Sequence, residues 1–175
     1  VSYFQGNFAP VQKEHNEPCK EVIGEIPKAL EGAFLRIGAN PVFVNDPEAY
    51  HPFVGDGMVH EVVFENGRAT YINRFVETDG HLAEQEKGGL IWDGPATPPE
   101  ILDQYGPSKN IANTAMIFHA GMFLALQEAA QPFRLTLPNL DPLGEVDYEG
   151  RLTHAFSAHP KLDPRTGELV AYGYD

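Results

Sequence analysis

The stretch VHEVVFENGRATYINRFV, residues 59–76, decides the fold. Its first part is rich in β-branched and apolar residues, and the part that begins at Arg68 alternates between outward and inward side chains. Asn66-Gly67 separates the two runs. Asn-Gly between two strand-like runs is the strongest short signal for a β-hairpin, because both residues accept the positive φ that a tight turn needs. The segment therefore predicts two antiparallel strands.

The same strand periodicity recurs along the chain. A second hairpin is predicted from Thr114 to Phe118 and from Met122 to Gln127, with a tight turn at His119-Ala120-Gly121. Fifteen prolines and seventeen glycines break up helical patterns, so only short helices are expected. Further predicted strands are Phe133 to Leu137, Leu152 to Phe156 and Leu169 to Tyr174, and the predicted helices are Pro27 to Glu31 and Pro99 to Tyr105. This is an all-β pattern with short helical insertions, and it leaves both a sandwich and a propeller open.

Composition restricts the partners and the compartment. The 175 residues suffice for one domain with a core, and they carry 12 basic against 25 acidic side chains, for a net charge of −13. This balance disfavours binding to nucleic acid and to anionic lipid. Cys19 is the one cysteine, so an internal disulfide is impossible and a reducing compartment, the cytoplasm, is expected. No apolar run is long enough to predict a membrane-spanning helix.

The seven histidines do not form a local metal-binding pair. A lone histidine in a strand is more often packed than bound to a metal, so His60, His119 and His154 are predicted to be structural. The segment GDGMVH, residues 55–60, is also interpreted as structural. Its glycines suit a tight turn with positive φ, and Asp56 can accept backbone N–H groups there.

Four short segments together resemble the carotenoid cleavage oxygenase family. They are GNFAPV (6–11), GDGMVH (55–60), FLALQE (123–128) and SAHPKLDP (157–164), the last continuing into DPRTGE (163–168). The resemblance implies part of a seven-bladed β-propeller with Fe(II) on its central axis. It also implies a reaction in which O2 cleaves a carbon–carbon double bond of an apolar polyene, a carotenoid or apocarotenoid, to carbonyl products.

The resemblance assigns roles to two residues. It implies that His159, in the Ala-His-Pro-Lys segment, is the first of four iron ligands. It implies that Glu128 accepts a hydrogen bond from an iron-bound imidazole, which would fix the tautomer of that ring. The substrate is expected in an apolar tunnel beside the iron rather than bonded to it. Phe53 and Trp92 could line such a tunnel, although core packing is the favoured interpretation of both.

Family members are longer than this chain, which corresponds to their first third. Residues 1–175 are therefore expected to be the N-terminal portion of a single propeller catalytic domain. The other three histidine ligands would follow Asp175, and these residues alone are predicted to be inactive. The oligomeric state is not predicted.

Three alternatives remain open. The stilbene-cleaving branch carries a lysine at the position of Gln127, and it also carries a tyrosine near the position of Pro95. This chain has neither residue there, so the resemblance favours a carotenoid-type substrate over a stilbene. Residues 95–110 are short and polar, which disfavours membrane docking through them. Their short length is nevertheless similar to that of the stilbene-cleaving branch. The second alternative is a non-catalytic relative that binds an apolar ligand. The third is a propeller hydrolase with calcium or zinc, whose usual carboxylate and asparagine cluster is not evident.

Overall fold

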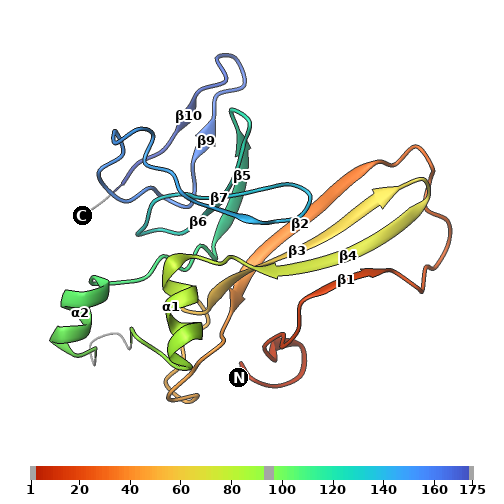
Figure 1. The fold of residues 1–175 in the computed structure, drawn as a ribbon. Helices are drawn as coiled ribbons and strands as arrows, with labels where there is room; N and C mark the ends of the chain where they lie inside the picture. Colours follow the sequence, from red (N-terminus) through yellow and green to blue (C-terminus); the bar gives the residue numbers. More distant parts are fainter. Residues whose placement is uncertain (1–2, 93–96, 174–175) are drawn as a thin grey trace.

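Antiparallel sheet makes up most of the computed structural model, which describes residues 3–92 and 97–173 (Figure 1). One four-stranded sheet has the order β1-β4-β3-β2 and the other the order β5-β6-β7-β8. The first contains β1 (His15–Pro18), β2 (Gly32–Asn40), β3 (Asp56–Glu65) and β4 (Arg68–Phe75). The second contains β5 (Ala115–His119), β6 (Met122–Leu126), β7 (Phe133–Leu135) and β8 (Pro142–Glu145), and β9 (Lys161–Leu162) pairs with β10 (Leu169–Val170).

Helical structure is short, as predicted. A 3-10 turn, η1 (Gly6–Phe8), lies near the N-terminus. Helices α1 (Asp79–Lys87) and α2 (Pro99–Tyr105) both lie in the segment that links β4 to β5, beside the point where the chain passes from one sheet to the other (Figure 1). The predicted all-β class with short helical insertions is confirmed.

Both predicted hairpins are present. Asn66 and Gly67 have φ values of 51° and 75° between β3 and β4, the pair of positive values that a two-residue hairpin turn requires. In the second hairpin His119 pairs with Met122, so the turn consists of Ala120 and Gly121 alone. That turn is one residue shorter than predicted.

Several predicted elements are wrong. Residues 27–31 form a turn that leads into β2, not a helix. Residues 152–156 make a single bridge, from Phe156 to Ala130, instead of a strand. Of the predicted last strand, Leu169 to Tyr174, only Leu169–Val170 forms a strand, β10, among the described residues. The predicted end at Tyr174 lies outside the described residues. Strands β1, β2, β8 and β9 and helix α1 were not predicted.

Helix α1 has clear end signals despite its polar sequence. The Thr78 hydroxyl accepts a hydrogen bond from the backbone N–H of His81 at 3.2 Å, which caps the first turn. Gly88 ends the helix with a φ of 72°, the left-handed conformation in which glycine is favoured. A threonine before the helix and a glycine after it were therefore the available sequence signals.

Strand β6 is buried on both of its faces. Phe123 and Ala125 join Val59, Ile72 and other residues in a core between the two four-stranded sheets. Leu124 and Leu126 point the other way and pack with Phe156 and Ala158 in a second core. This alternation explains the uninterrupted apolar run of β6, since each successive side chain enters one core or the other. The second core also brings residues 156–158 against the end of β6.

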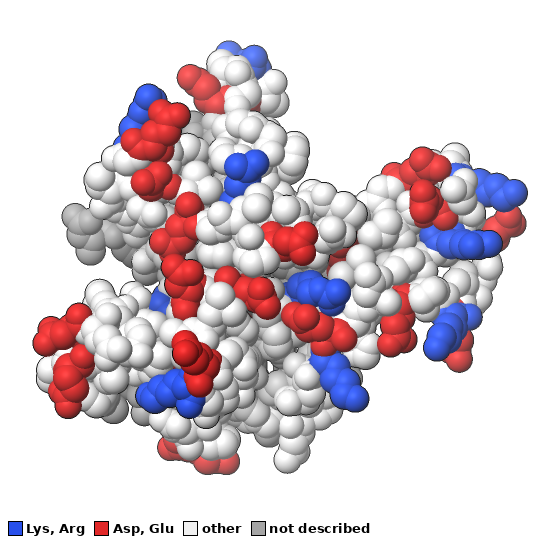
Figure 2. Space-filling view, in the orientation of Figure 1, with Lys and Arg blue, Asp and Glu red and all other residues white. Residues whose placement is uncertain are grey.

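The molecular surface is mixed in charge. On the face that Figure 2 shows, acidic side chains are spread over the middle and the ends of the molecule, with basic side chains scattered among them. Among the described residues, no helix combines the length and the apolar character needed to cross a membrane.

Glu61 is an unusual buried charge in the core between the sheets. It lies on β3 between Val59 and Val63, with Leu35 and Ile72 as its cross-strand neighbours. Its side chain is fully buried, and neither carboxylate oxygen has a hydrogen-bond partner among the described residues. Burial raises the pKa of this carboxyl, because the charged form loses its hydration.

Replacing Glu61 by Met should therefore stabilise the protein at neutral pH. The pKa of Glu61 is higher in the folded state than in the unfolded state. As pH rises between these two pKa values, the unfolded chain loses its proton first, so the free energy of unfolding falls. It stays lower at all higher pH values. Glu61→Met should raise the free energy of unfolding at neutral pH by about 1–3 kcal/mol and remove that decline. Denaturant unfolding between about pH 4 and pH 8 measures both effects. Glu65→Met, at the exposed end of the same strand, is the control; an unchanged pH dependence in Glu61→Met would contradict the account.

Candidate functional site

His159 lies on a loop that the second core fixes. The three residues before it, Phe156, Ser157 and Ala158, are buried, whereas 60% of the His159 side chain is exposed. The Phe156 N–H donates to the carbonyl of Ala130 at 3.0 Å, and the loop continues directly into β9. The sequence thus anchors the backbone with apolar side chains and leaves the imidazole free to face outward.

Glu128 lies beside His159 in space, although 31 positions along the chain separate the two. It follows β6 by two residues, so the buried strand fixes its backbone. Glu128 Oε1 is 2.8 Å from His159 Nε2. A carboxylate can only accept a hydrogen bond, so Nε2 carries a proton in this arrangement. The two residues singled out from the sequence therefore form one imidazole–carboxylate pair.

The His159–Glu128 pair could supply one metal ligand and its hydrogen-bond acceptor, but not a complete metal site. A metal-binding imidazole usually donates its second ring N–H to a carboxylate or carbonyl, which is the contact that Glu128 makes. One imidazole cannot hold a metal ion by itself. Within residues 3–92 and 97–173, no group of three histidine, cysteine, aspartate or glutamate side chains is arranged to hold one. A metal ion held by His159 would need its further ligands from outside these residues.

Two other histidines bond to backbone carbonyls. His154, the main competitor to His159 in the same loop, has its Nδ1 2.7 Å from the carbonyl oxygen of Ala155. His119 Nε2 lies 2.9 Å from the carbonyl oxygen of Gly167. Neither imidazole has a carboxylate partner among the described ion pairs, in contrast to His159.

The two aromatic residues considered for a tunnel have different environments. Phe53 is 75% exposed, so the interpretation that it packs in the core is wrong. Its ring contacts only that of His51 among the described aromatic pairs, with the centroids 5.0 Å apart. Trp92 is partly buried, donates its indole N–H to the carbonyl of Gly106 at 3.0 Å, and packs edge-on against Tyr105.

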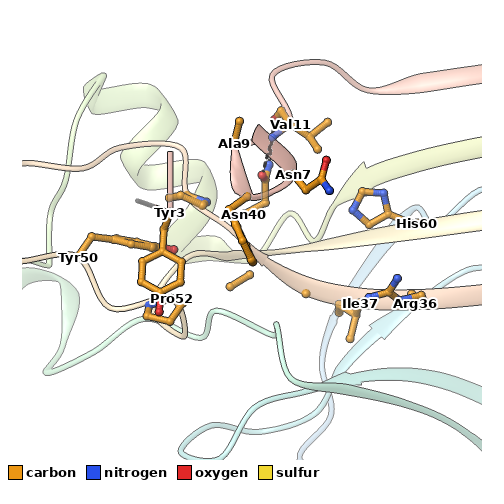
Figure 3. A pocket seen from close by; sticks show the side chains of 14 residues that line it. Tyr3, Asn7, Ala9, Val11, Arg36, Ile37, Asn40, Tyr50, Pro52 and His60 are labelled. Carbon is orange, nitrogen blue, oxygen red and sulfur yellow. Dashed lines mark hydrogen bonds between the residues drawn. The ribbon is translucent and has the colours of Figure 1, made fainter. Parts of the chain in front are cut away.

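A pocket of about 480 Å³ lies between the N-terminal segment and β2, away from both predicted site residues (Figure 3). Asn40 closes one side through hydrogen bonds of 2.8 and 2.9 Å with the backbone of Val11. His60 and Arg36 line another part, and His60 Nδ1 is 2.7 Å from the Tyr71 hydroxyl. Burial, and then the charge of Arg36, lower the pKa of His60, so this imidazole is neutral at pH 7.

The segment GDGMVH opens strand β3 instead of forming a tight turn. The prediction of positive φ at its glycines is wrong, and Gly57 is extended and paired with Ala39. The close approach of another segment explains this glycine. A Cβ atom at Gly57 would lie 2.2 Å from the carbonyl oxygen of Ala112, and the Gly57 N–H donates to the Ile111 carbonyl at 2.7 Å.

Asp56 belongs to a buried ionic cluster that the sequence did not reveal. Lys109 Nζ is 2.8 Å from Asp56 Oδ1 and is also paired with Glu84, and His81 Nδ1 is 3.4 Å from Asp56 Oδ1. All four side chains are at most 9% exposed. Burial alone would raise the pKa of Asp56, but the hydrogen bond from His81 and the charge of Lys109 hold it below its usual value. The expected backbone N–H partners of Asp56 are replaced by these side chains.

The ionic cluster has a structural character. The Lys109 ammonium pairs with both carboxylates and so balances buried negative charge. The second oxygen of Glu84 accepts the backbone N–H of Ile91 at 2.9 Å. The cluster thus joins the start of β3, helix α1 and the segment before β5.

Comparisons with known proteins identify the class of the fold. The chain superposes on the crystal structure of Pseudomonas brassicacearum lignostilbene dioxygenase with a TM-score of 0.86 and 32% identity, over 99% of this chain and 37% of that one. It matches cobalt-substituted ACO of Synechocystis with a TM-score of 0.76 and 36% identity, over 89% of this chain and 34% of that one. The fold is therefore that of part of an oxygenase β-propeller.

The sequence comparisons define the family. Carotenoid 9,10(9',10')-cleavage dioxygenase 1 of Arabidopsis thaliana is 42% identical over 198 residues, which cover 99% of this chain and 36% of that protein. The sequence profile described as retinal pigment epithelial membrane protein matches residues 8–175. The chain belongs to this family, and the resemblance drawn from the four segments is confirmed. It spans about a third of the length of the curated relatives it matches.

Loss of the Lys109 charge should destabilise the fold strongly. Lys109→Met would leave Asp56 and Glu84 buried without a cation, a change that typically costs about 3–5 kcal/mol. Denaturant unfolding at neutral pH measures the loss, and Lys87→Met, which removes an exposed ammonium bonded to the Leu90 carbonyl, is the control. A loss for Lys109→Met no larger than that of the control would show that the cluster does not hold these elements together.

Proposed function

We propose that the full-length protein is an Fe(II)-dependent dioxygenase that cleaves a carbon–carbon double bond of a carotenoid or apocarotenoid to carbonyl products. The observation that carries the proposal is the His159–Glu128 pair, at 2.8 Å, on a loop anchored by a buried core. Residues 1–175 would be the N-terminal portion of one propeller catalytic domain. The single cysteine favours a reducing compartment, the cytoplasm, for this protein.

The proposed metal role of His159 follows from its chemistry. A neutral imidazole is a suitable ligand for Fe(II), and its exposed ring is open to further ligands from the rest of the protein. When bound, Fe(II) would supply the activation of O2. Glu128 would hold the imidazole in one tautomer and one orientation, which strengthens the nitrogen as a donor. The cobalt-substituted form of the Synechocystis relative supports the choice of a divalent transition metal.

Carotenoid-type substrates are favoured by two observations. Two curated plant relatives, 42% and 39% identical to this chain, are named carotenoid cleavage dioxygenases. Gln127, beside Glu128, supplies an amide where the stilbene-cleaving branch has a lysine. A stilbene substrate is the second candidate, because a lignostilbene dioxygenase matches 99% of this chain with a TM-score of 0.86. In either case the protein would position an apolar alkene beside the metal and exclude water from it.

Removal of the His159 imidazole should abolish both iron binding and cleavage. In the full-length protein, His159→Ala should lower the iron content to less than about a tenth and the rate of apocarotenoid cleavage accordingly, since the metal loses a ligand. Glu128→Gln should retain iron with about 10–100-fold weaker affinity. Elemental analysis and chromatography of the aldehyde products under air measure the two quantities.

His154→Ala is the matched control, because it removes an imidazole of the same loop whose hydrogen-bond partner, among the described residues, is a backbone carbonyl. It should keep its iron and its activity. Full iron content in His159→Ala, or parallel losses in both histidine variants, would overturn the assignment.

A further inference from the structure

The loop of residues 51–54 carries exposed apolar side chains on a fixed base. Phe53 and Val54 are 75% and 57% exposed, whereas Gly55, which follows them, is buried. The chain is closely packed at that point, because a Cβ atom added at Gly55 would lie 2.8 Å from the backbone nitrogen of Pro41. Two adjacent apolar side chains are therefore presented to their surroundings from a well-defined place.

A single buried asparagine holds this loop. Asn113 is 7% exposed, and its Nδ2 donates to the carbonyl of Phe53 at 2.8 Å and to the carbonyl of Gly55 at 2.7 Å. Both lengths are those of good hydrogen bonds. Carbonyl oxygens can only accept, so the amide nitrogen must face them, and it uses both of its protons on the backbone on either side of Val54.

Asn113 also places the loop at the end of the β5–β6 hairpin that carries Glu128. The next residue, Thr114, donates its backbone N–H to the carbonyl of Leu126 at 2.9 Å, and Glu128 lies two residues beyond Leu126. The Thr114 hydroxyl donates to Asn113 Oδ1 at 2.9 Å, so the amide oxygen is held as well. Phe53 and Glu128 therefore lie at the same end of the second sheet.

We propose that Asn113 is a positioning residue for the substrate: it fixes the loop of residues 51–54 so that Phe53 and Val54 form part of the apolar wall against which the polyene lies. This inference rests on the proposed function. A polyene offers apolar surface and few polar groups, so a protein recognises it through the shape and position of apolar walls. A wall that shifts no longer fits the extended chain, and the substrate binds more weakly.

Asn73 provides the comparison within this chain. It has 0% exposure, and its amide also bonds to the backbone of a remote segment: Oδ1 accepts the N–H of His15 at 2.6 Å, and Nδ2 donates to the carbonyl of Lys13 at 2.9 Å. That segment leads into β1, at an edge of the first sheet. If Asn113 only stabilised the fold, the loss of either asparagine would lower stability and neither would affect the substrate.

Binding and turnover of an apocarotenal by the full-length protein test the proposal. Quenching of tryptophan fluorescence in the metal-free protein gives the Kd, and chromatography of the aldehyde products formed by the iron-loaded protein gives KM and kcat. Asn113→Ala should raise Kd and KM about 5- to 30-fold, the effect of losing two hydrogen bonds, and should change kcat less. Phe53→Ala should raise Kd and KM in the same way. Asn73→Ala should lose thermal stability but keep the Kd and KM of the wild type.

The double variant Asn113→Ala/Phe53→Ala shows whether Asn113 acts through the loop. If it does, the two losses should not add, and the Kd of the double variant should be close to that of the more weakly binding single variant. Two independent contributions to binding would instead multiply.

The outcomes separate the two proposals. Unchanged Kd and KM in Asn113→Ala or in Phe53→Ala, an equal loss in Asn73→Ala, or additive losses in the double variant would overturn the positioning role and leave the proposed function intact. A wild type that binds no iron, or that does not cleave the apocarotenal, would overturn the proposed function and this inference with it. If Asn113→Ala does not fold, Asn113→Ser replaces it; its hydroxyl has one donor proton for two carbonyls, so Kd should rise in the same direction.

Discussion

The burial of β6 on both faces is the constraint on which the rest of the structure depends. Phe123 and Ala125 pack in the core between the two four-stranded sheets. Leu124 and Leu126 pack against Phe156 and Ala158, in the loop that carries His159. A strand packed on both sides cannot shift by one residue without moving every side chain into the wrong core. The position of Glu128, two residues beyond the strand, is therefore set by packing and not by the charge of its own carboxylate.

The same packing explains how residues distant in sequence form one site. Phe156 and Ala158 enter the second core on alternate positions, and the intervening Ser157 bonds to Glu128. His159 follows at the edge, where its ring is exposed on one side and held by the carboxylate on the other. The arrangement combines a rigid backbone with an accessible imidazole, and a metal ligand needs both properties.

Local signals in the sequence predicted what local chemistry controls. Asn66-Gly67 specified its hairpin because the turn needs two positive φ values, and the apolar run from Met122 to Leu126 specified a buried strand. Helix α1 was missed because its glycine and its polar face lower its helical signal, although Thr78 and Gly88 mark its ends. Residues 152–156 have strand-like composition, but only Leu152 and Phe156 pack in the second core, and the backbone makes one bridge.

The features around the candidate site that were missed depend on contacts between remote residues. The need for glycine at position 57 comes from the Ala112 carbonyl, and the partner of Asp56 is Lys109. No periodicity or short motif encodes such pairs. His159 and Glu128 were found because of the family resemblance, since neither residue stands out by spacing alone. Their contact became visible only in three dimensions.

Anomalous diffraction at the iron absorption edge, from crystals of the full-length protein, tests the central claim most directly. The account predicts one strong iron peak within bonding distance of a ring nitrogen of His159, with the Glu128 carboxylate hydrogen-bonded to an iron-bound imidazole. An iron peak whose ligands do not include His159, or iron-loaded crystals in which this imidazole bonds only to Glu128, would contradict it.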